Sequence, residues 1–273
     1  MEPRLGTCGD AMALPLLWGL TSGKVRHGFE LVPDSLASNG LKFREGSLES
    51  SFLSPIDYAR SDPSTQIVPK IGVAAAGGAL TAAIFFAGGL KDISTLAVDV
   101  RFPSEVLLAK IILMEQWGTT PRFVPSDSLL DAVGSRTDAA LLVGEAAWKA
   151  AGTSDQYIDL LESWEDLTDL PFVHVMVAVK EDALAQEHID ALRASQQLGI
   201  KTARNILVDR SGELGISLET LDRVLENYYR FELDEPALES LTEFFRYAYC
   251  HGSLTDLPDL KFVEPGKKTA SGT

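Results

Sequence analysis

The side chains best placed for chemistry in this sequence stand where predicted strands meet helices or cross the fold: Ser54, Thr81, Ser104 and Glu145. Hydroxyl and carboxylate groups at such junctions can hydrogen bond to a ligand, and the first N–H groups of a helix attract anions. Two structural alternatives stay open, because a serine at a helix start is often only an N-cap and Glu145 can simply complement a helix dipole. The pattern indicates a protein that holds a small molecule.

The junction at Gly144-Glu145 is the clearest of these positions. Ala139–Val143 is a short apolar run typical of a buried strand, and a helical pattern follows it at once. A strand that runs into a helix start places N–H groups at the carboxyl end of a sheet, where open α/β proteins bind ligands. Phe172–Val179 is a second buried strand, and together the two strands predict a binding crevice.

Arg101, His174 and the predicted helix start at Ser54 extend the candidate site. Arg101 precedes a helical pattern and is the cation best placed to meet a carboxylate, although a surface role is equally consistent. His174 interrupts the apolar run PFVHVMVAV, so it is either a hydrogen-bonded buried histidine or a group directed into the cleft. Ser54, Pro55 and Asp57 have the spacing of a helix start, with Ser54 at the N-cap and Pro55 at the first helical position.

Charge restricts the partners of this chain. Its 39 acidic and 24 basic residues give a formal net charge of −15 over 273 residues. Because phosphate contacts need a basic face, we expect neither a nucleic acid nor a membrane as partner. We expect instead a small-molecule carboxylate, held by local donors on a monomer or a homodimer.

Targeting and redox signals favour the cytoplasm. The start MEPRLGTCGD lacks the basic and apolar regions of a signal peptide, and Ala74–Leu90 is too short and too rich in glycine for a membrane span. Cys8 and Cys250 are predicted to be free thiols, since they form no CxxC pair. Nucleotide-binding and zinc motifs are absent from the sequence, so we expect no zinc site.

Strands alternate with helices over the first two thirds of the chain, and the last third is helical, which predicts an α/β fold with a C-terminal helical layer. The predicted strands are Arg4–Cys8, Glu30–Val32, one ending at Phe52–Leu53, Gln66–Ala75, Leu80–Phe86, Thr95–Val100, Arg122–Val124, Ala139–Val143 and Phe172–Val179. The predicted helices include Ser35–Phe43, Ser104–Trp117, Ser128–Val133, Glu187–Arg210, Ser217–Phe231 and Pro236–Tyr249. The stretch between the strands at 139–143 and 172–179 is read as one short helix and a polar connector.

Several segments, in their order and spacing, carry a family resemblance: RLG with PLLWGL, FLSPIDYAR, LAVDV before the helix at Ser104, WGTTPRFVPSD, DAALLVGEAAW and SWEDLTDLPFVHVMVAV. Over roughly residues 4 to 254 the chain resembles the chorismate dehydratase family of the futalosine route to menaquinone. The resemblance implies a two-lobed, periplasmic-binding-protein-like (type II) fold with an interlobe cleft and C-terminal helices. Residues 1–88 and 175–273 would form the first lobe, and residues 89–174 the second.

The resemblance also implies a reaction and a site. Related enzymes remove water from chorismate to give 3-[(1-carboxyvinyl)oxy]benzoate without a metal or organic cofactor. Thr81 would be the catalytic hydroxyl, since it keeps the hydroxyl of a family Asp-Gly-Pro-Val-x-Ser stretch. The substrate-binding positions would be Gly9, Met12, Ser54, Pro55, Arg101, Ser104, Gly144, Glu145 and His174.

The chain departs from the family pattern at several positions, two of them in the first-strand motif. Gly9 and Met12 stand where the family carries a serine and an asparagine, so an amide that can donate and accept hydrogen bonds is replaced by an apolar thioether. The alternative function is therefore a non-catalytic, cytoplasmic protein on the same scaffold that binds a small carboxylate.

Overall fold

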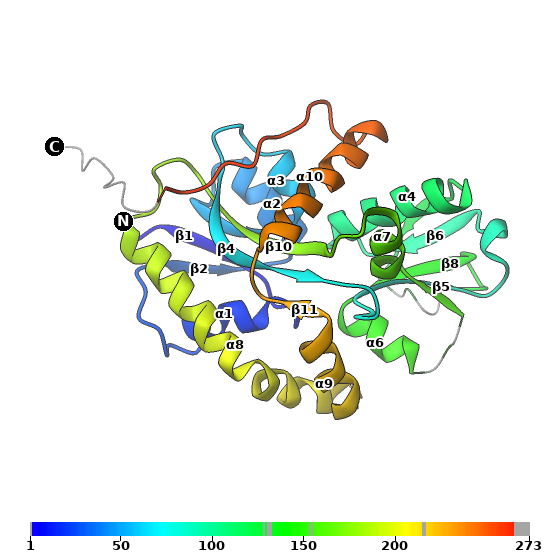
Figure 1. Cartoon of the computed structure of the whole chain (residues 1–273), viewed down its shortest axis with the longest axis horizontal. Coiled ribbons are helices and arrows are strands. Elements are labelled where there is room, and N and C mark those ends of the chain that lie inside the picture. The colour runs from blue at the N-terminus through cyan, green and yellow to red at the C-terminus, as the bar shows by residue number, and fades with distance from the viewer. Residues whose placement is uncertain are drawn as a thin grey trace.

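Two β-sheets organise the chain, as the computed structural model in Figure 1 shows. The structure describes residues 2–127, 129, 133–152, 154, 156–214 and 217–264. The first sheet has the order β11 (Tyr229–Arg230), β4 (Gln66–Ala75), β10 (Phe172–Val179), β3 (Ser50–Leu53), β1 (Arg4–Thr7) and β2 (Glu30–Pro33). The second has the order β7 (Arg122–Pro125), β6 (Thr95–Val98), β8 (Ala139–Val143), β5 (Ala82–Phe86) and β9 (Tyr157–Asp159).

Helices cover both sheets. Those associated with the first sheet are α1 (Leu14–Thr21), α2 (Leu36–Arg44), α3 (Pro55–Ala59), α8 (Gln186–Leu214), α9 (Leu218–Asn227) and α10 (Glu235–Cys250). Those associated with the second are α4 (Pro103–Trp117), α6 (Glu145–Ala151) and α7 (Leu160–Thr168), and a 3₁₀ turn η1 (Leu90–Asp92) precedes β6. In Figure 1, α1 and α8 lie on one side of the first sheet, and α2, α3 and α10 lie on the other.

The first sheet contains both parallel and antiparallel strand pairs. β1 pairs in parallel with β2 and β3, whereas β10 pairs antiparallel with both β3 and β4. All eight residues of β10 are buried, because neighbouring strands flank it and helices cover its faces. Apart from His174 its residues are apolar, as expected of a strand that is buried on both faces. The two lobes and the α/β class are therefore as predicted.

The chain crosses between the sheets twice, at residues 76–81 between β4 and β5 and at residues 169–171 between α7 and β10. β5 therefore belongs to the second sheet, although the predicted limits counted its residues with the first lobe. Apart from this strand, the sheets divide the chain near the predicted limits. The division into two domains stays a prediction.

The stretch read as a polar connector after α6 is where the sequence interpretation was wrong. It contains β9 and α7, with the Asp159 side chain accepting a hydrogen bond from Leu161 N–H at the start of the helix. Trp164 is fully buried and donates its indole N–H to the Ser240 hydroxyl. The polar residues lie on the outer face of this helix. Because they dominate the sequence there, the apolar residues of its buried face were not recognised as a helical pattern. Most of the predicted helix at 128–133 lies outside the described residues.

The last third of the chain returns to the first lobe. α8 packs along α1, α10 packs on β10, and β11 extends the sheet beside β4. After α10, the segment at residues 253–264 lies against the start of β4, where Ile67 pairs with Phe262. Cys8 and Cys250 are free thiols, as predicted. Within the described residues, no helix is both long and apolar enough to cross a membrane.

Candidate functional site

A pocket of about 600 Å³ lies between the two lobes. Its lining comes from the loop after β1, the segment between β6 and α4, residues 127 and 129 after β7, and the junction of β8 with α6. Five of the positions predicted to contact a ligand line it together: Gly9, Met12, Arg101, Gly144 and Glu145. The structure thus brings one part of the predicted site into a single cleft.

Local backbone geometry explains why Met12 and Gly144 face each other. After β1, a turn forms in which Ala13 N–H and Leu14 N–H both donate to the Asp10 carbonyl, at 3.0 and 3.1 Å. After β8, Gly144 takes a positive φ of 61°, which favours glycine, and its N–H donates to the Thr81 carbonyl at 2.7 Å. A Cβ at position 144 would lie 3.7 Å from the Met12 methyl carbon, so the two segments form one continuous apolar wall.

Acidic groups outnumber basic groups around this pocket. The carboxylates are Asp10, Asp99, Asp127 and Glu145, and the cations are Arg101 and Lys149. The Arg101 Nε atom lies 2.9 Å from both carboxylate oxygens of Asp99, and this hydrogen bonding raises the pKa of Arg101 above its ordinary value. Much of the Arg101 charge is therefore already neutralised by Asp99.

Asp10 is one of the titratable groups of this cleft that the sequence interpretation missed. The pKa of its carboxyl is raised to about 6, first by burial and then by the negative charge of Glu105, while Arg101 opposes the shift. In the described part of the chain, no group donates a hydrogen bond to this carboxyl. A signal was available in the sequence, since Asp10 lies between the two predicted contact positions Gly9 and Met12.

Ser54, Pro55 and Ser104 lie together but outside the pocket lining. The Ser54 hydroxyl donates to Asp57 Oδ2 at 2.8 Å and accepts from Asp57 N–H at 3.3 Å, which is the predicted N-cap of α3. The Ser104 hydroxyl accepts from Ile56 N–H at 3.0 Å. Both serines are fully buried, so these donors and acceptors at the start of α3 are used within the protein.

Thr81 and His174 form a second buried group, together with Glu105. The Thr81 hydroxyl lies 2.9 Å from His174 Nε2, and His174 Nδ1 lies 2.7 Å from Glu105 Oε1. All three side chains have no exposed surface. With Nδ1 donating to the carboxylate, Nε2 can accept the Thr81 proton, which is the order of groups in a hydrolase triad. We call Thr81, His174 and Glu105 the buried relay.

The buried relay does not line the interlobe pocket. It lies behind the pocket wall, where the Thr81 carbonyl accepts the Gly144 N–H. It joins the first crossing (Thr81), the central strand β10 (His174) and the first turn of α4 (Glu105). The structure thus places His174 in a hydrogen-bonded buried position, the first of the two alternatives open from the sequence.

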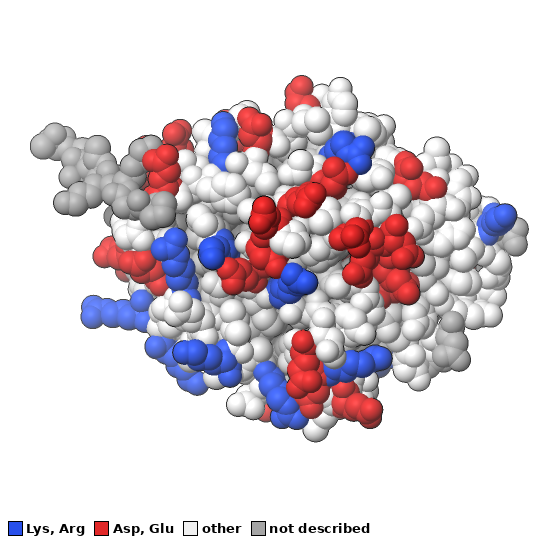
Figure 2. Space-filling model, in the orientation of Figure 1, with Lys and Arg blue, Asp and Glu red and all other residues white. Residues whose placement is uncertain are grey.

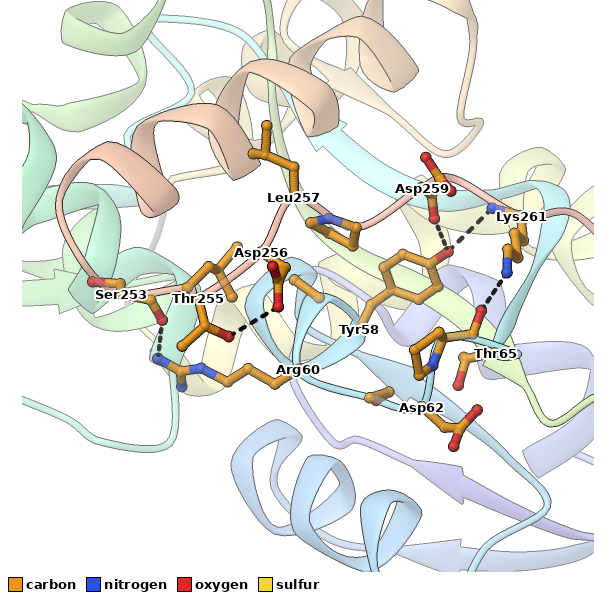
Figure 3. A pocket seen from close by; sticks show the side chains of 15 residues that line it. Tyr58, Arg60, Asp62, Thr65, Ser253, Thr255, Asp256, Leu257, Asp259 and Lys261 are labelled. Carbon is orange, nitrogen blue, oxygen red and sulfur yellow. Dashed lines mark hydrogen bonds between the residues drawn. The ribbon is translucent and has the colours of Figure 1, made fainter.

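A second pocket, of about 530 Å³, lies between the end of α3 and the chain after α10 (Figure 3). The Tyr58 hydroxyl donates to the Asp259 carbonyl at 2.9 Å and accepts from Lys261 N–H at 3.2 Å. The Lys261 ammonium donates to the Pro63 carbonyl at 2.7 Å. Because these groups fasten the C-terminal segment, the interlobe pocket is the stronger candidate for a ligand.

The surface charge sets a further condition on any anionic ligand. On the face drawn in Figure 2, acidic side chains gather over α7, whereas basic side chains lie singly or in small groups. The long-range field of such a protein does not steer a dianion toward it, so local contacts must provide the affinity. Within the described residues, no three His, Cys, Asp or Glu side chains come together as a metal site.

Two lobes with a cleft between them define the class of periplasmic-binding-protein-like proteins, and solved structures agree. A protein from Archaeoglobus fulgidus superposes with a TM-score of 0.74 at 20% identity, covering 92% of this chain and 98% of its own. A Candida albicans protein with the generic periplasmic binding protein fold has a TM-score of 0.67 at 12% identity, covering 94% and 92%. The periplasmic aliphatic sulphonate binding protein SsuA of Escherichia coli has a TM-score of 0.61 at 11% identity, covering 94% of this chain and 95% of its own.

Within this class, the sequence itself decides the family. The family model described as menaquinone biosynthesis matches residues 3–250, which is nearly the whole chain. The chain therefore belongs to the menaquinone biosynthesis family, the chorismate dehydratase family that its segments resemble.

Proposed function

We propose that this protein is a chorismate dehydratase-like lyase, which eliminates water from chorismate to give 3-[(1-carboxyvinyl)oxy]benzoate in menaquinone biosynthesis. The observation that carries the proposal is the family match over residues 3–250. We further propose that the protein works in the cytoplasm on this small carboxylate, as a monomer or a homodimer, without a cofactor.

The interlobe pocket supports this reaction in three ways. It has a volume suited to a small ring compound, and Met12, Phe102 and Leu142 supply apolar surface for the ring. Lys149 is a cation available to a carboxylate group, and Arg101, paired with Asp99, borders the same pocket. Because loss of water makes the ring aromatic, the protein needs mainly to orient the substrate and move one proton.

One observation favours the alternative, a non-catalytic protein that binds a small carboxylate. Met12 is buried and turns its methyl carbon toward Gly144, at the position where the family resemblance implies an asparagine. A thioether is a poor hydrogen-bonding group, so this part of the wall can hold a ring but cannot replace an amide. Binding without turnover would follow if that amide were essential.

The test compares turnover and binding in the same preparation. Chorismate is incubated with the wild type and with Met12→Asn, product is measured by chromatography, and chorismate binding is measured by calorimetry. Product from the wild type supports the lyase. If the wild type binds chorismate without forming product, and Met12→Asn does form product, the binding protein is supported. If the wild type neither binds nor converts chorismate, chorismate is ruled out as the ligand of this site.

A further inference from the structure

Asp10 is a cleft carboxyl to which neither the fold nor the family resemblance gives a role. It follows β1 directly and lines the interlobe pocket beside Gly9 and Met12. Its side chain is half-buried, and its carboxyl accepts no hydrogen bond within the part of the chain that the structure describes. A carboxyl that faces a cleft without an internal partner is available to a ligand.

The surroundings of Asp10 are mostly acidic. The carboxylates that act on it electrostatically are Glu105 in the first turn of α4, Glu145 at the start of α6 and Asp99 just after β6. Arg101 is the opposing cation, and it is held by Asp99. Burial and these like charges favour the protonated form, so the pKa of Asp10 is raised to about 6. A carboxyl in this state can both accept and return a proton near neutral pH.

Several other polar groups near the cleft are less suitable for proton transfer. Asp99 is committed to Arg101, and Asp127 lies exposed. The three side chains of the buried relay hydrogen bond to one another, and they do not line the pocket. Met12, beside Asp10, offers apolar contact that would hold a ring against the carboxyl.

We propose that Asp10 is the base of the elimination in this cleft, and that it takes the place of the polar group that the family site has lost. This inference rests on the proposed function. The Asp10 carboxylate removes the proton from the ring carbon that bears the enolpyruvyl ether. The electron pair of that C–H bond forms the new ring double bond as the neighbouring C–O bond breaks. The departing hydroxyl takes the proton from Asp10 and leaves as water, so the carboxylate is regenerated.

The experiment compares Asp10→Asn and Asp10→Glu with the wild type, with Asp256→Asn as a control that removes one carboxylate from the other pocket. We expect Asp10→Asn to lower kcat by about 10²–10⁴-fold while product binding, measured by calorimetry, stays within threefold. Asp10→Glu should recover part of the rate. The wild-type kcat should fall about tenfold for each pH unit below about 6, because the base is then protonated.

The outcomes separate this inference from the proposed function. No product from the wild type at any pH overturns the lyase reaction, and the role of Asp10 as its base with it. Product from the wild type, together with an Asp10→Asn rate within threefold, overturns Asp10 alone. Equal rate losses in Asp10→Asn and Asp256→Asn would likewise show that only net charge matters, which overturns the assignment.

Discussion

At the scale of single residues, the most consequential feature is a set of polar side chains sealed inside an apolar core. Glu105, His174 and Thr81 satisfy one another, and Glu105 Oε2 is left without a hydrogen-bond partner among the described residues. A buried polar group is tolerated when it is paired and becomes costly when its partner is removed. Each member of the buried relay therefore depends on the others.

Removing the Thr81 hydroxyl tests this dependence. Thr81→Val leaves His174 Nε2 without its partner, so we expect the free energy of unfolding to fall by about 1–3 kcal/mol. Thr81→Ser keeps the hydroxyl and should lose less. Urea denaturation followed by fluorescence measures both variants.

Turnover by the same two variants tests the role in catalysis predicted for Thr81. If the hydroxyl also serves the transition state, Thr81→Val should lower turnover by about 10²–10³-fold, whereas Thr81→Ser should retain most of it. A Val variant that keeps full turnover and loses only stability would assign Thr81 a structural role alone.

Asp10 also affects stability, with a sign that follows from its raised pKa. The folded protein binds this proton more tightly than the unfolded chain, whose carboxyl has the ordinary value of 3.8. Stability from this group is therefore present below about pH 4 and is lost as the pH rises through about 6. For a partly buried group, the loss is about 1–2 kcal/mol.

Asp10→Asn abolishes this titration. We expect the variant to be more stable than the wild type by about 1–2 kcal/mol at pH 8, with the difference vanishing toward pH 4. Thermal unfolding measured across this pH range, with Asp256→Asn as control, reports the effect. A variant less stable than the wild type at pH 8 would contradict the raised pKa.

The sequence could identify some of these residues, but not their proton affinity or their hydrogen-bond partners. Gly9, Met12, Arg101, Gly144 and Glu145 were found because they follow strands or match a family pattern, and they meet in one pocket. Asp10 needed the structure, because its proton affinity depends first on its burial and then on the charge of Glu105, which is distant in sequence. Ser54 and Ser104 show the opposite case. Both stand at the predicted helix starts, but their hydroxyls hydrogen bond within the protein interior.

At the scale of elements, α3 shows how a short helix is held by its neighbours. Its five residues start at an N-cap, and a hydroxyl from α4 accepts one of its first N–H groups. Asp57 in its first turn also pairs with Arg44 at 2.6 Å. A helix this short has little stability of its own, so these contacts fix it.

Ser104→Ala tests the contact between α4 and α3. The change leaves Ile56 N–H buried without an acceptor, and we expect a loss of about 1–3 kcal/mol in the free energy of unfolding. The exposed Ser47 provides the matched control, and Ser47→Ala should change stability by no more than about 0.5 kcal/mol. Equal effects of the two changes in chemical denaturation would contradict the importance of this contact.

Strand and helix periods predicted most elements, including β4, β8 and β10 at the limits that the structure has. The sequence failed where an element has little apolar pattern of its own. α7 was missed because its outer face is acidic, and β11 was read as the end of a helix because its two residues become a strand only by pairing with β4. Such elements are defined by tertiary packing rather than by local preference.

At the scale of the whole molecule, the C-terminal segment closes an edge of the first sheet. Ile67 N–H donates to the Lys261 carbonyl at 2.7 Å, and Val263 N–H donates to the Ile67 carbonyl at 3.0 Å. Deleting the chain from residue 253 should expose this edge of β4, lowering the unfolding temperature and promoting association. Calorimetry and light scattering measure the two effects, and a truncated chain that matches the full chain in both would contradict this role.

The attachment of the second lobe to the first has a consequence for how a ligand enters. Besides the two chain crossings, the start of α4 is tied to the first lobe by Glu105 to His174 in β10 and by Ser104 to Ile56 in α3. Swinging the lobes apart would break buried hydrogen bonds, so the angle between them should be nearly the same with and without ligand. Solution X-ray scattering would then give superimposable profiles before and after ligand is added. The cleft would then be a rigid receptor, and closure of the lobes would contribute nothing to its affinity. The rate at which small molecules enter and leave would be limited only by diffusion through the opening of the cleft.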